Sequence, residues 1–117
     1  MIIGATPNPS RYAFLAAERL TNHHHPIVPV GIKQGEVFGN QILDLREKPS
    51  VDEVDTVTLY LNPAHQHEWE EYILSLRPKR IIFNPGTENP ELEAKAAEQG
   101  IDTLNACTLV MLSASTF

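Results

Sequence analysis

The chain has 117 residues, with 15 acidic and nine basic side chains, a formal charge of −6 at pH 7 and a single cysteine. This length supports one hydrophobic core, so we expect a single domain over residues 1–117, and the lone Cys107 excludes an internal disulfide. Nucleic acids are bound mainly through Lys and Arg, so the acidic balance of the chain argues against nucleic-acid binding. No apolar run approaches the roughly 20 residues of a membrane-spanning helix, and no signal peptide is recognisable. We therefore expect a cytoplasmic protein that binds neither nucleic acid nor membrane.

Short apolar runs rich in β-branched residues recur along the chain and predict the strands of a sheet. They begin near Met1, Ile27, Asp55, Lys79 and Ile101. Each interval is long enough for one strand, one helix and two short loops. Strands and helices that alternate in this way imply an α/β domain with a mostly parallel sheet and helices on both faces.

Apolar residues at helical spacing predict the helices between these strands. The spacing i, i+3, i+4 and i+7 marks two of them, through Ala13, Ala16, Ala17 and Leu20 in one and Trp69, Tyr72, Ile73 and Leu76 in the other. A third helix is predicted from about Pro90 to Gln99, and a short one over residues 108–112. The Gly-rich segment 31–43 is too polar for a helix and predicts a reduced third strand with a loop.

Asn-Pro pairs occur at four places in the sequence. Those at Asn8, Asn62 and Asn89 stand where helices are predicted to begin, and Asn84 opens a loop after a strand. Asn is a favourable N-cap and Pro is tolerated at the first helical position. These polar loops gather at the carboxyl edge of the sheet, where open α/β domains bind ligands. Capping alone also explains each pair, and it does not conflict with a site there.

The first predicted loop, residues 4–9, occupies the place of the Gly-x-Gly-x-x-Gly turn of dinucleotide-binding folds. Gly4 matches the first glycine, whereas Thr6 and Pro9 replace the other two. A side chain at the second glycine position keeps a pyrophosphate from the backbone, which disfavours a normally seated NAD. The following helix still presents free amide groups and the positive end of its dipole to an anion.

The second predicted strand lacks the acidic residue that binds the ribose of NAD. The first charged residue after this strand is Lys33. A cation at this position favours a phosphate on the ribose, as in CoA or NADP. The alternative is a solvated loop lysine, which for Lys33 taken alone is the more common situation.

Taken in order, these residues resemble the small stand-alone CoA-binding proteins related to the CoA-binding domain of the succinyl-CoA synthetase alpha subunit. The similar positions fall into five blocks: Gly4-Ala5-Thr6 with Pro9 and Arg11-Tyr12; Pro29-Val30 with Lys33 and Gly39; Val54-Asp55, Val57 and Asn62; Lys79 to Asn84 with Gly86; and Gly100-Ile101 with Cys107. The resemblance implies a single Rossmann-like domain in three layers, with a sheet of five to six strands, that binds CoA or an acyl-CoA.

The resemblance also implies which residues contact the ligand. The backbone of Gly4, Ala5 and Thr6 is expected at the phosphates, with Arg11 as a countercharge and Tyr12 beside it. The adenosine is expected between Pro29, Val30 and Gly31, with Lys33 near its phosphate. The remaining side is expected to comprise Asn62, Pro63, Asn84, Pro85, Gly86 and Thr87, with Cys107 at the same edge. Two arginines typical of the family are replaced by Leu61 and Ala106, so a different nucleotide is also considered.

The remaining reactive side chains do not form a recognisable catalytic set. Three consecutive histidines, residues 23–25, cannot all face one metal ion from a tight turn, and His65 and His67 diverge on a helix. Cys107 is interpreted as packing, with a thiol close to the CoA sulfur as the alternative. We therefore expect a CoA-binding or sensor module rather than an enzyme. The alternatives are an NADP-dependent oxidoreductase and a protein-interaction subunit, and a homo-oligomer or protein partner stays open.

Overall fold

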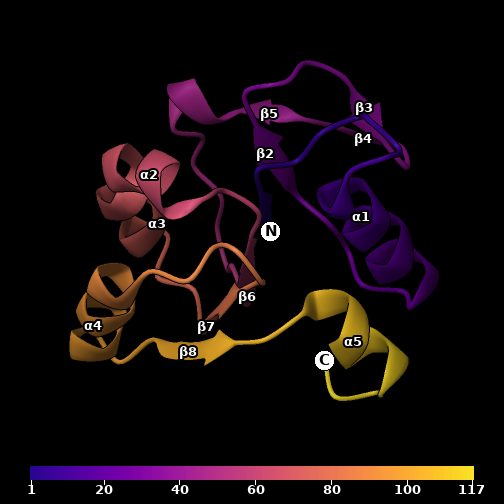
Figure 1. Ribbon diagram of the computed structural model, residues 1–117. Coiled ribbons are helices and arrows are strands. Elements are labelled where there is room, and N and C mark those ends of the chain that lie inside the picture. The colour runs from indigo at the N-terminus through magenta and orange to yellow at the C-terminus, as the bar shows by residue number, and fades with distance from the viewer.

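Six parallel strands form the central sheet of a computed structural model that describes residues 1–117 (Figure 1). In chain order they are β1 (Ile2–Ile3), β2 (Pro29–Gly31), β5 (Leu43–Asp44), β6 (Thr56–Leu59), β7 (Arg80–Phe83) and β8 (Asp102–Asn105). Their order in space is β5-β2-β1-β6-β7-β8. The chain therefore builds one half of the sheet outward from β1 and the other half outward from β6. The order reverses between β1 and β6, which is where α/β sheets bind ligands.

Helices cover both faces of the sheet, which confirms the predicted three-layer Rossmann-like fold (Figure 1). The helices on one face are α1 (Tyr12–Asn22) and α5 (Thr108–Ser113), and those on the other are α2 (Pro63–Gln66), α3 (Glu70–Ser75) and α4 (Pro90–Glu98). One 3-10 turn (His67–Trp69) joins α2 to α3, and another (Leu45–Glu47) follows β5. None of the helices combines the length and the apolar character needed to cross a membrane.

Two separate cores lie above and below the sheet. Successive residues of a strand point to opposite faces, so the fully buried Ile2 and Ile3 enter different cores. Ile3 packs in the core that includes Leu59 and Phe83 and that α3 and α4 cover. Ile2 packs in the smaller core beneath α1 and α5. The short strand β1 therefore ends between two rigid layers, and the loop that follows it starts from a well-fixed position.

The Gly-rich segment after β2 forms a small hairpin followed by the short strand β5, which agrees with the predicted reduced third strand. The hairpin strands are β3 (Glu36–Val37) and β4 (Asn40–Gln41), and they pair antiparallel. Gly39 lies at the turn with φ = +82°, a backbone conformation that glycine adopts without strain. Phe38 packs against Phe14 of α1, with ring centroids 5.1 Å apart. The hairpin is thereby anchored beside the first loop.

Two of the three Asn-Pro pairs predicted to begin helices do so. Asn62 accepts a hydrogen bond from the His65 amide at 3.0 Å, and Asn89 accepts one from the Leu92 amide at 3.2 Å. The prediction is wrong for Asn8, because α1 begins at Tyr12 and its N-cap residue makes no side-chain capping bond. Asn8 instead accepts hydrogen bonds from the amide and hydroxyl of Ser10. The first turn of α1 is consequently left without a side-chain cap.

Candidate ligand-binding cleft at the carboxyl edge of the sheet

A cleft of about 590 Å³ lies where the strand order reverses. The loops after β1, β2, β6 and β7 form its walls. The lining residues are Gly4, Ala5, Thr6, Asn8, Arg11, Tyr12, Ala13, Ile32, Lys33, Tyr60, Leu61, Asn62, His65, Pro85, Gly86 and Thr87. The volume lies in the range typical of small-molecule and cofactor sites. Its place at the carboxyl ends of β1 and β6 is the position that the fold provides for a ligand.

The charges that line this cleft have one sign. Arg11 and Lys33 supply two cations and His65 an imidazole, whereas none of the 15 acidic side chains of the chain lines the cleft. A protein of net charge −6 therefore keeps a locally cationic cleft. Such an arrangement attracts anions and raises their local concentration at the site.

Close backbone packing shapes the first loop. Gly4 has φ = +101°, and a Cβ there would lie 2.9 Å from the Tyr60 carbonyl group. A Cβ on Gly31 would lie 2.5 Å from the Ala5 carbonyl oxygen. The loop after β1 is thus wedged between β2 and β6, and side chains at these two glycines would displace it.

Two of the three backbone amides expected at the phosphates are already hydrogen-bonded within the chain. The amides of Gly4 and Ala5 both donate to the Val30 carbonyl oxygen, at 2.8 and 3.0 Å. Both residues line the cleft, but their N–H groups are already used to hold β1 and β2 together. The amides of Thr6, Tyr12 and Ala13 make no hydrogen bond within the chain. An anion in the cleft would therefore meet Thr6 and the uncapped first turn of α1.

The three residues predicted to flank the adenosine do not line the cleft. Pro29, Val30 and Gly31 are buried in β2 and do not line the cleft. The next two residues, Ile32 and Lys33, form that wall instead. Because all three residues of a strand inside a covered parallel sheet are enclosed by neighbours, only the residues after the strand can reach a ligand.

Asn84 and Cys107 also stand apart from the cleft. Asn84 is 2% exposed, and its amide donates to the Thr58 hydroxyl at 2.7 Å and the Leu59 carbonyl oxygen at 2.8 Å. Its Oδ1 accepts from the Thr108 amide at 2.9 Å. These bonds fasten α5 to the sheet. Cys107 is partly buried just before α5, and neither it nor Pro63 lines the cleft.

Sequence reasoning missed several lining residues. They are Asn8, Ala13, Ile32, Tyr60, Leu61 and His65. Tyr60 and Leu61 directly follow β6 as Gly4 and Ala5 follow β1. This equivalent position after a neighbouring strand could have predicted that Tyr60 and Leu61 line the cleft. Burial raises the pKa of Tyr60 to about 12, against the opposing effect of the Thr108 hydroxyl. Tyr60 is therefore a neutral phenol at physiological pH and offers a hydrogen bond rather than a charge.

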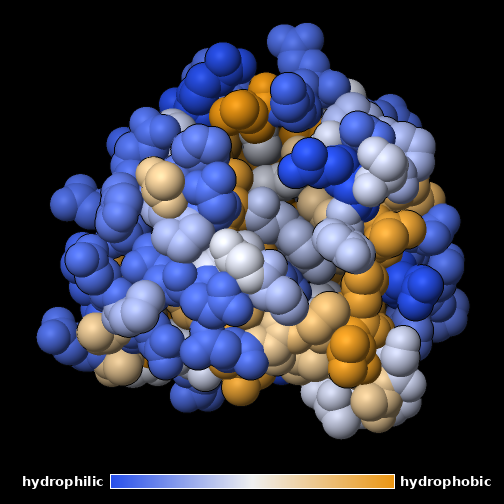
Figure 2. Space-filling view, in the orientation of Figure 1, coloured by the Kyte–Doolittle hydropathy of each residue, from blue (hydrophilic) through white to orange (hydrophobic).

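Large apolar side chains are exposed at the mouth of the cleft. Tyr12 is 71% exposed and Ile32 is 56% exposed. The face of the molecule seen in Figure 2 is mostly hydrophilic, with apolar side chains at the surface in a few separate places. Two apolar side chains that flank a cationic cleft suit a ligand with both a charged and an aromatic part.

A second cavity, of about 450 Å³, lies at the opposite, amino edge of the sheet. Its arginine, Arg80, donates to the Thr56 hydroxyl at 2.8 Å and to the Phe117 carbonyl oxygen at 3.0 Å. The guanidinium also lies 4.6 Å from the centre of the Phe117 ring. Because these contacts already occupy Arg80, and because Asp52, Glu53 and Asp55 line the same cavity, we do not assign an anion site there.

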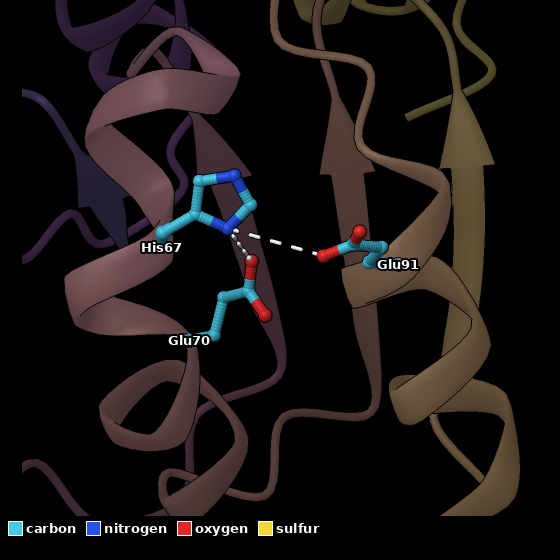
Figure 3. A group of neighbouring side chains, drawn as sticks. All are labelled: His67, Glu70 and Glu91. Carbon is cyan, nitrogen blue, oxygen red and sulfur yellow. Dashed lines mark ion pairs between the residues drawn. The ribbon is translucent and has the colours of Figure 1, made fainter.

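His67, Glu70 and Glu91 form a cluster between the α2–α3 segment and α4 (Figure 3). His67 Nδ1 lies 3.1 Å from Glu70 Oε2 and 4.0 Å from Glu91 Oε2. The other oxygen of Glu70 accepts a hydrogen bond from Lys95 Nζ at 2.9 Å. Because this ammonium already neutralises the buried carboxylate, we interpret the cluster as an ion-pair network between helices rather than a metal site.

Together these features define a Rossmann-like α/β domain with a cationic cleft at its switch point. A family model of the CoA binding domain matches residues 1–113, and the chain belongs to this family. No curated protein matches it.

Solved structures have the same fold. One, the crystal structure of an uncharacterized protein, gives a TM-score of 0.95 at 59% identity, over 99% of this chain and 94% of that chain. A hypothetical protein from Pyrococcus horikoshii OT3 gives a TM-score of 0.82 at 30% identity, over 97% of this chain and 80% of the other. A Thermus thermophilus protein, cell-free ID.343, gives a TM-score of 0.83 at 24% identity, over 99% of this chain and 87% of the other. At this identity the similarity shows a shared fold only.

Proposed function

We propose that the chain binds CoA or an acyl-CoA in the cleft at the switch point and acts as a binding or sensor module without chemistry of its own. The observation that carries this proposal is the cationic lining, with Arg11 and Lys33 and no carboxylate, beside the unbonded amides of α1. In a member of the CoA binding domain family, these groups suit the three phosphates of CoA.

The nucleotide half of the ligand is proposed to bind over the first loop and β2. The amides of Thr6, Tyr12 and Ala13, with Arg11 beside them, would meet the diphosphate. Lys33 would meet the phosphate on the ribose. The exposed faces of Tyr12 and Ile32 offer apolar surface to the adenine ring.

The pantetheine arm is proposed to run along the opposite wall, toward β6 and β7. This wall carries Leu61, Asn62 and the segment Pro85–Thr87. It contains no Lys or Arg side chain. A wall that carries neither a Lys or Arg side chain nor a carboxylate suits an uncharged arm that contains two amide groups.

NADP is the second candidate, because a phosphate on its ribose would also suit Lys33. Thr6 weakens this alternative, since it stands where NAD(P) folds carry the second glycine. A scaffold for protein partners is the third candidate, and it requires no small ligand.

A thermal-shift panel of CoA, acetyl-CoA, dephospho-CoA, NADP, NAD and ATP tests the proposal. A ligand that binds only the folded state raises the melting temperature by mass action. We expect CoA and acetyl-CoA to give the largest shifts. Dephospho-CoA should bind roughly 10- to 100-fold more weakly if Lys33 contacts the ribose phosphate. A larger shift with NADP than with CoA would favour the oxidoreductase, and no shift with any of the six would favour the scaffold.

A further inference from the structure

Gln66, at the end of α2, is a fully buried polar side chain behind the far wall of the cleft. It is 0% exposed and does not itself line the cleft. Its Nε2 donates to the Leu61 carbonyl oxygen at 2.7 Å and to the Thr87 carbonyl oxygen at 2.8 Å. Leu61 and Thr87 both line the cleft, on the loops after β6 and β7. One amide group therefore ties the two loops of the far wall together.

The remaining atom of this amide is also occupied. Gln66 Oε1 accepts a hydrogen bond from Asn89 Nδ2 at 3.0 Å, and Asn89 Nδ2 also donates to Glu70 Oε2 at 3.1 Å. The two loop carbonyl oxygens can only accept hydrogen bonds, so the Nε2 group must face them. Asn89 thus keeps the side chain of Gln66 in the one orientation that bridges the loops.

We propose that Gln66 is a positioning residue that sets the width of the far half of the cleft for the pantetheine arm of CoA. This inference rests on the function proposed above. Removing this amide alone would leave the carbonyl oxygens of Leu61 and Thr87 without their donor, which lowers stability, and it would also release the fixed spacing of the two loops. The loop after β7 keeps its internal bonds from the amide and hydroxyl of Thr87 to the Asn84 carbonyl oxygen. Without the bridge it would therefore shift relative to the loop after β6, and restoring the spacing when the ligand binds would cost affinity.

The test compares two ligands on the same variant. CoA reaches both halves of the cleft, whereas adenosine 3′,5′-bisphosphate lacks the pantetheine arm. We expect Gln66→Met, which keeps the length of the side chain but not its amide, to weaken CoA binding about tenfold. The affinity for adenosine 3′,5′-bisphosphate should change by less than about twofold. Both are measured by calorimetry well below the melting temperature of each variant.

A milder variant and a matched control complete the design. Gln66→Asn keeps the amide but is one methylene too short for both carbonyls, and it should give a smaller loss of the same selective kind if Gln66→Met does not fold. Tyr72→Phe removes another buried side-chain hydrogen bond, to the Pro49 carbonyl oxygen at 2.7 Å, away from the cleft. It should lower stability and leave both affinities unchanged.

The outcomes separate the inference from the proposed function. Equal losses for both ligands, or unchanged CoA affinity in folded Gln66→Met and Gln66→Asn, would overturn the positioning role while CoA binding stands. A wild-type protein that binds no CoA would overturn the proposed function, and this inference with it.

Discussion

Arg11 is a cation at the end of a helix where a positive charge is unfavourable. It is exposed at the N-cap position of α1, makes no side-chain capping bond and lines the cleft. A cation at this end of a helix is opposed by the helix dipole. The empty protein therefore gains nothing from this charge, whereas a bound phosphate would be stabilised by it.

Replacing Arg11 should consequently separate binding from stability. We expect Arg11→Gln to weaken CoA binding, to flatten its salt dependence and to stabilise the empty protein by about 0.3–1 kcal/mol. Calorimetry at two salt concentrations and a melting curve without ligand measure these effects.

Arg19 provides the matched control on the same helix. It is exposed in the last turn of α1, where a cation is favoured by the dipole. Arg19→Gln should leave CoA affinity unchanged and destabilise the protein slightly. If Arg11→Gln and Arg19→Gln behaved alike in binding, Arg11 would have no role at the phosphates.

At the scale of elements, α3 and α4 are joined by a buried carboxylate. Glu70 is 3% exposed and accepts hydrogen bonds from Lys95 and from Asn89, the N-cap residue of α4. Burial raises the pKa of Glu70, but the hydrogen bonds from Lys95 and Asn89 outweigh burial and lower the pKa below its ordinary value of 4.5. The charged form is therefore favoured in the folded protein more than in the unfolded chain.

This shift predicts a pH-dependent contribution to stability. A carboxyl group whose pKa is lowered by folding stabilises fully above its unfolded pKa, and the contribution is lost as the pH falls through the folded pKa. We expect Glu70→Gln to lower the free energy of unfolding at pH 7 by about 1–3 kcal/mol. The difference from wild type should shrink as the pH falls below 4.5, the ordinary pKa of Glu70.

Chemical denaturation of both proteins between neutral and acidic pH measures the difference. Glu71→Gln serves as the control, because Glu71 is exposed on the same helix and an exposed substitution changes stability little. A constant difference for Glu70→Gln across the pH range would show that the charge of Glu70 does not hold the helices together.

The elements themselves could be predicted because their signals are local. The stripe that includes Ala13 and Ala17 predicted α1, and Asn89 before Pro90 predicted the start of α4. The cap at Asn8 failed for an equally local reason, since Ser10 competes for the same side-chain oxygen. Helix boundaries are decided by such competition, which periodicity does not report.

At the scale of the whole molecule, the site depends on contacts between distant segments, and these could not be read from the sequence. The resemblance to CoA-binding proteins indicated the edge of the sheet at which the cleft lies. It did not indicate that Val30 occupies the amides of Gly4 and Ala5. Gln66 has no local signal either, because a glutamine in a polar helix segment is ordinarily a surface residue. Its burial follows only from the docking of α2 against the loop that contains Thr87.

The two halves of the sheet also explain how one acidic chain keeps a cationic cleft. Reversal of the strand order between β1 and β6 opens the cleft, and all 15 acidic side chains lie outside its lining. Arg11 and Lys33 approach it from one half of the fold, and the loops tied by Gln66 close the other side. The proposed function requires that CoA binds in this cleft.

A titration of ¹⁵N-labelled protein with CoA, followed by NMR, tests that claim most directly. If CoA binds in this cleft, the amide resonances of Thr6, Tyr12, Ala13 and Lys33 should shift most, because these groups would meet the phosphates. The resonances of Asp52 and Phe117, at the amino-edge cavity, should stay in place. Shifts centred on that amino-edge cavity, or no shifts up to millimolar CoA, would show that CoA does not bind in this cleft.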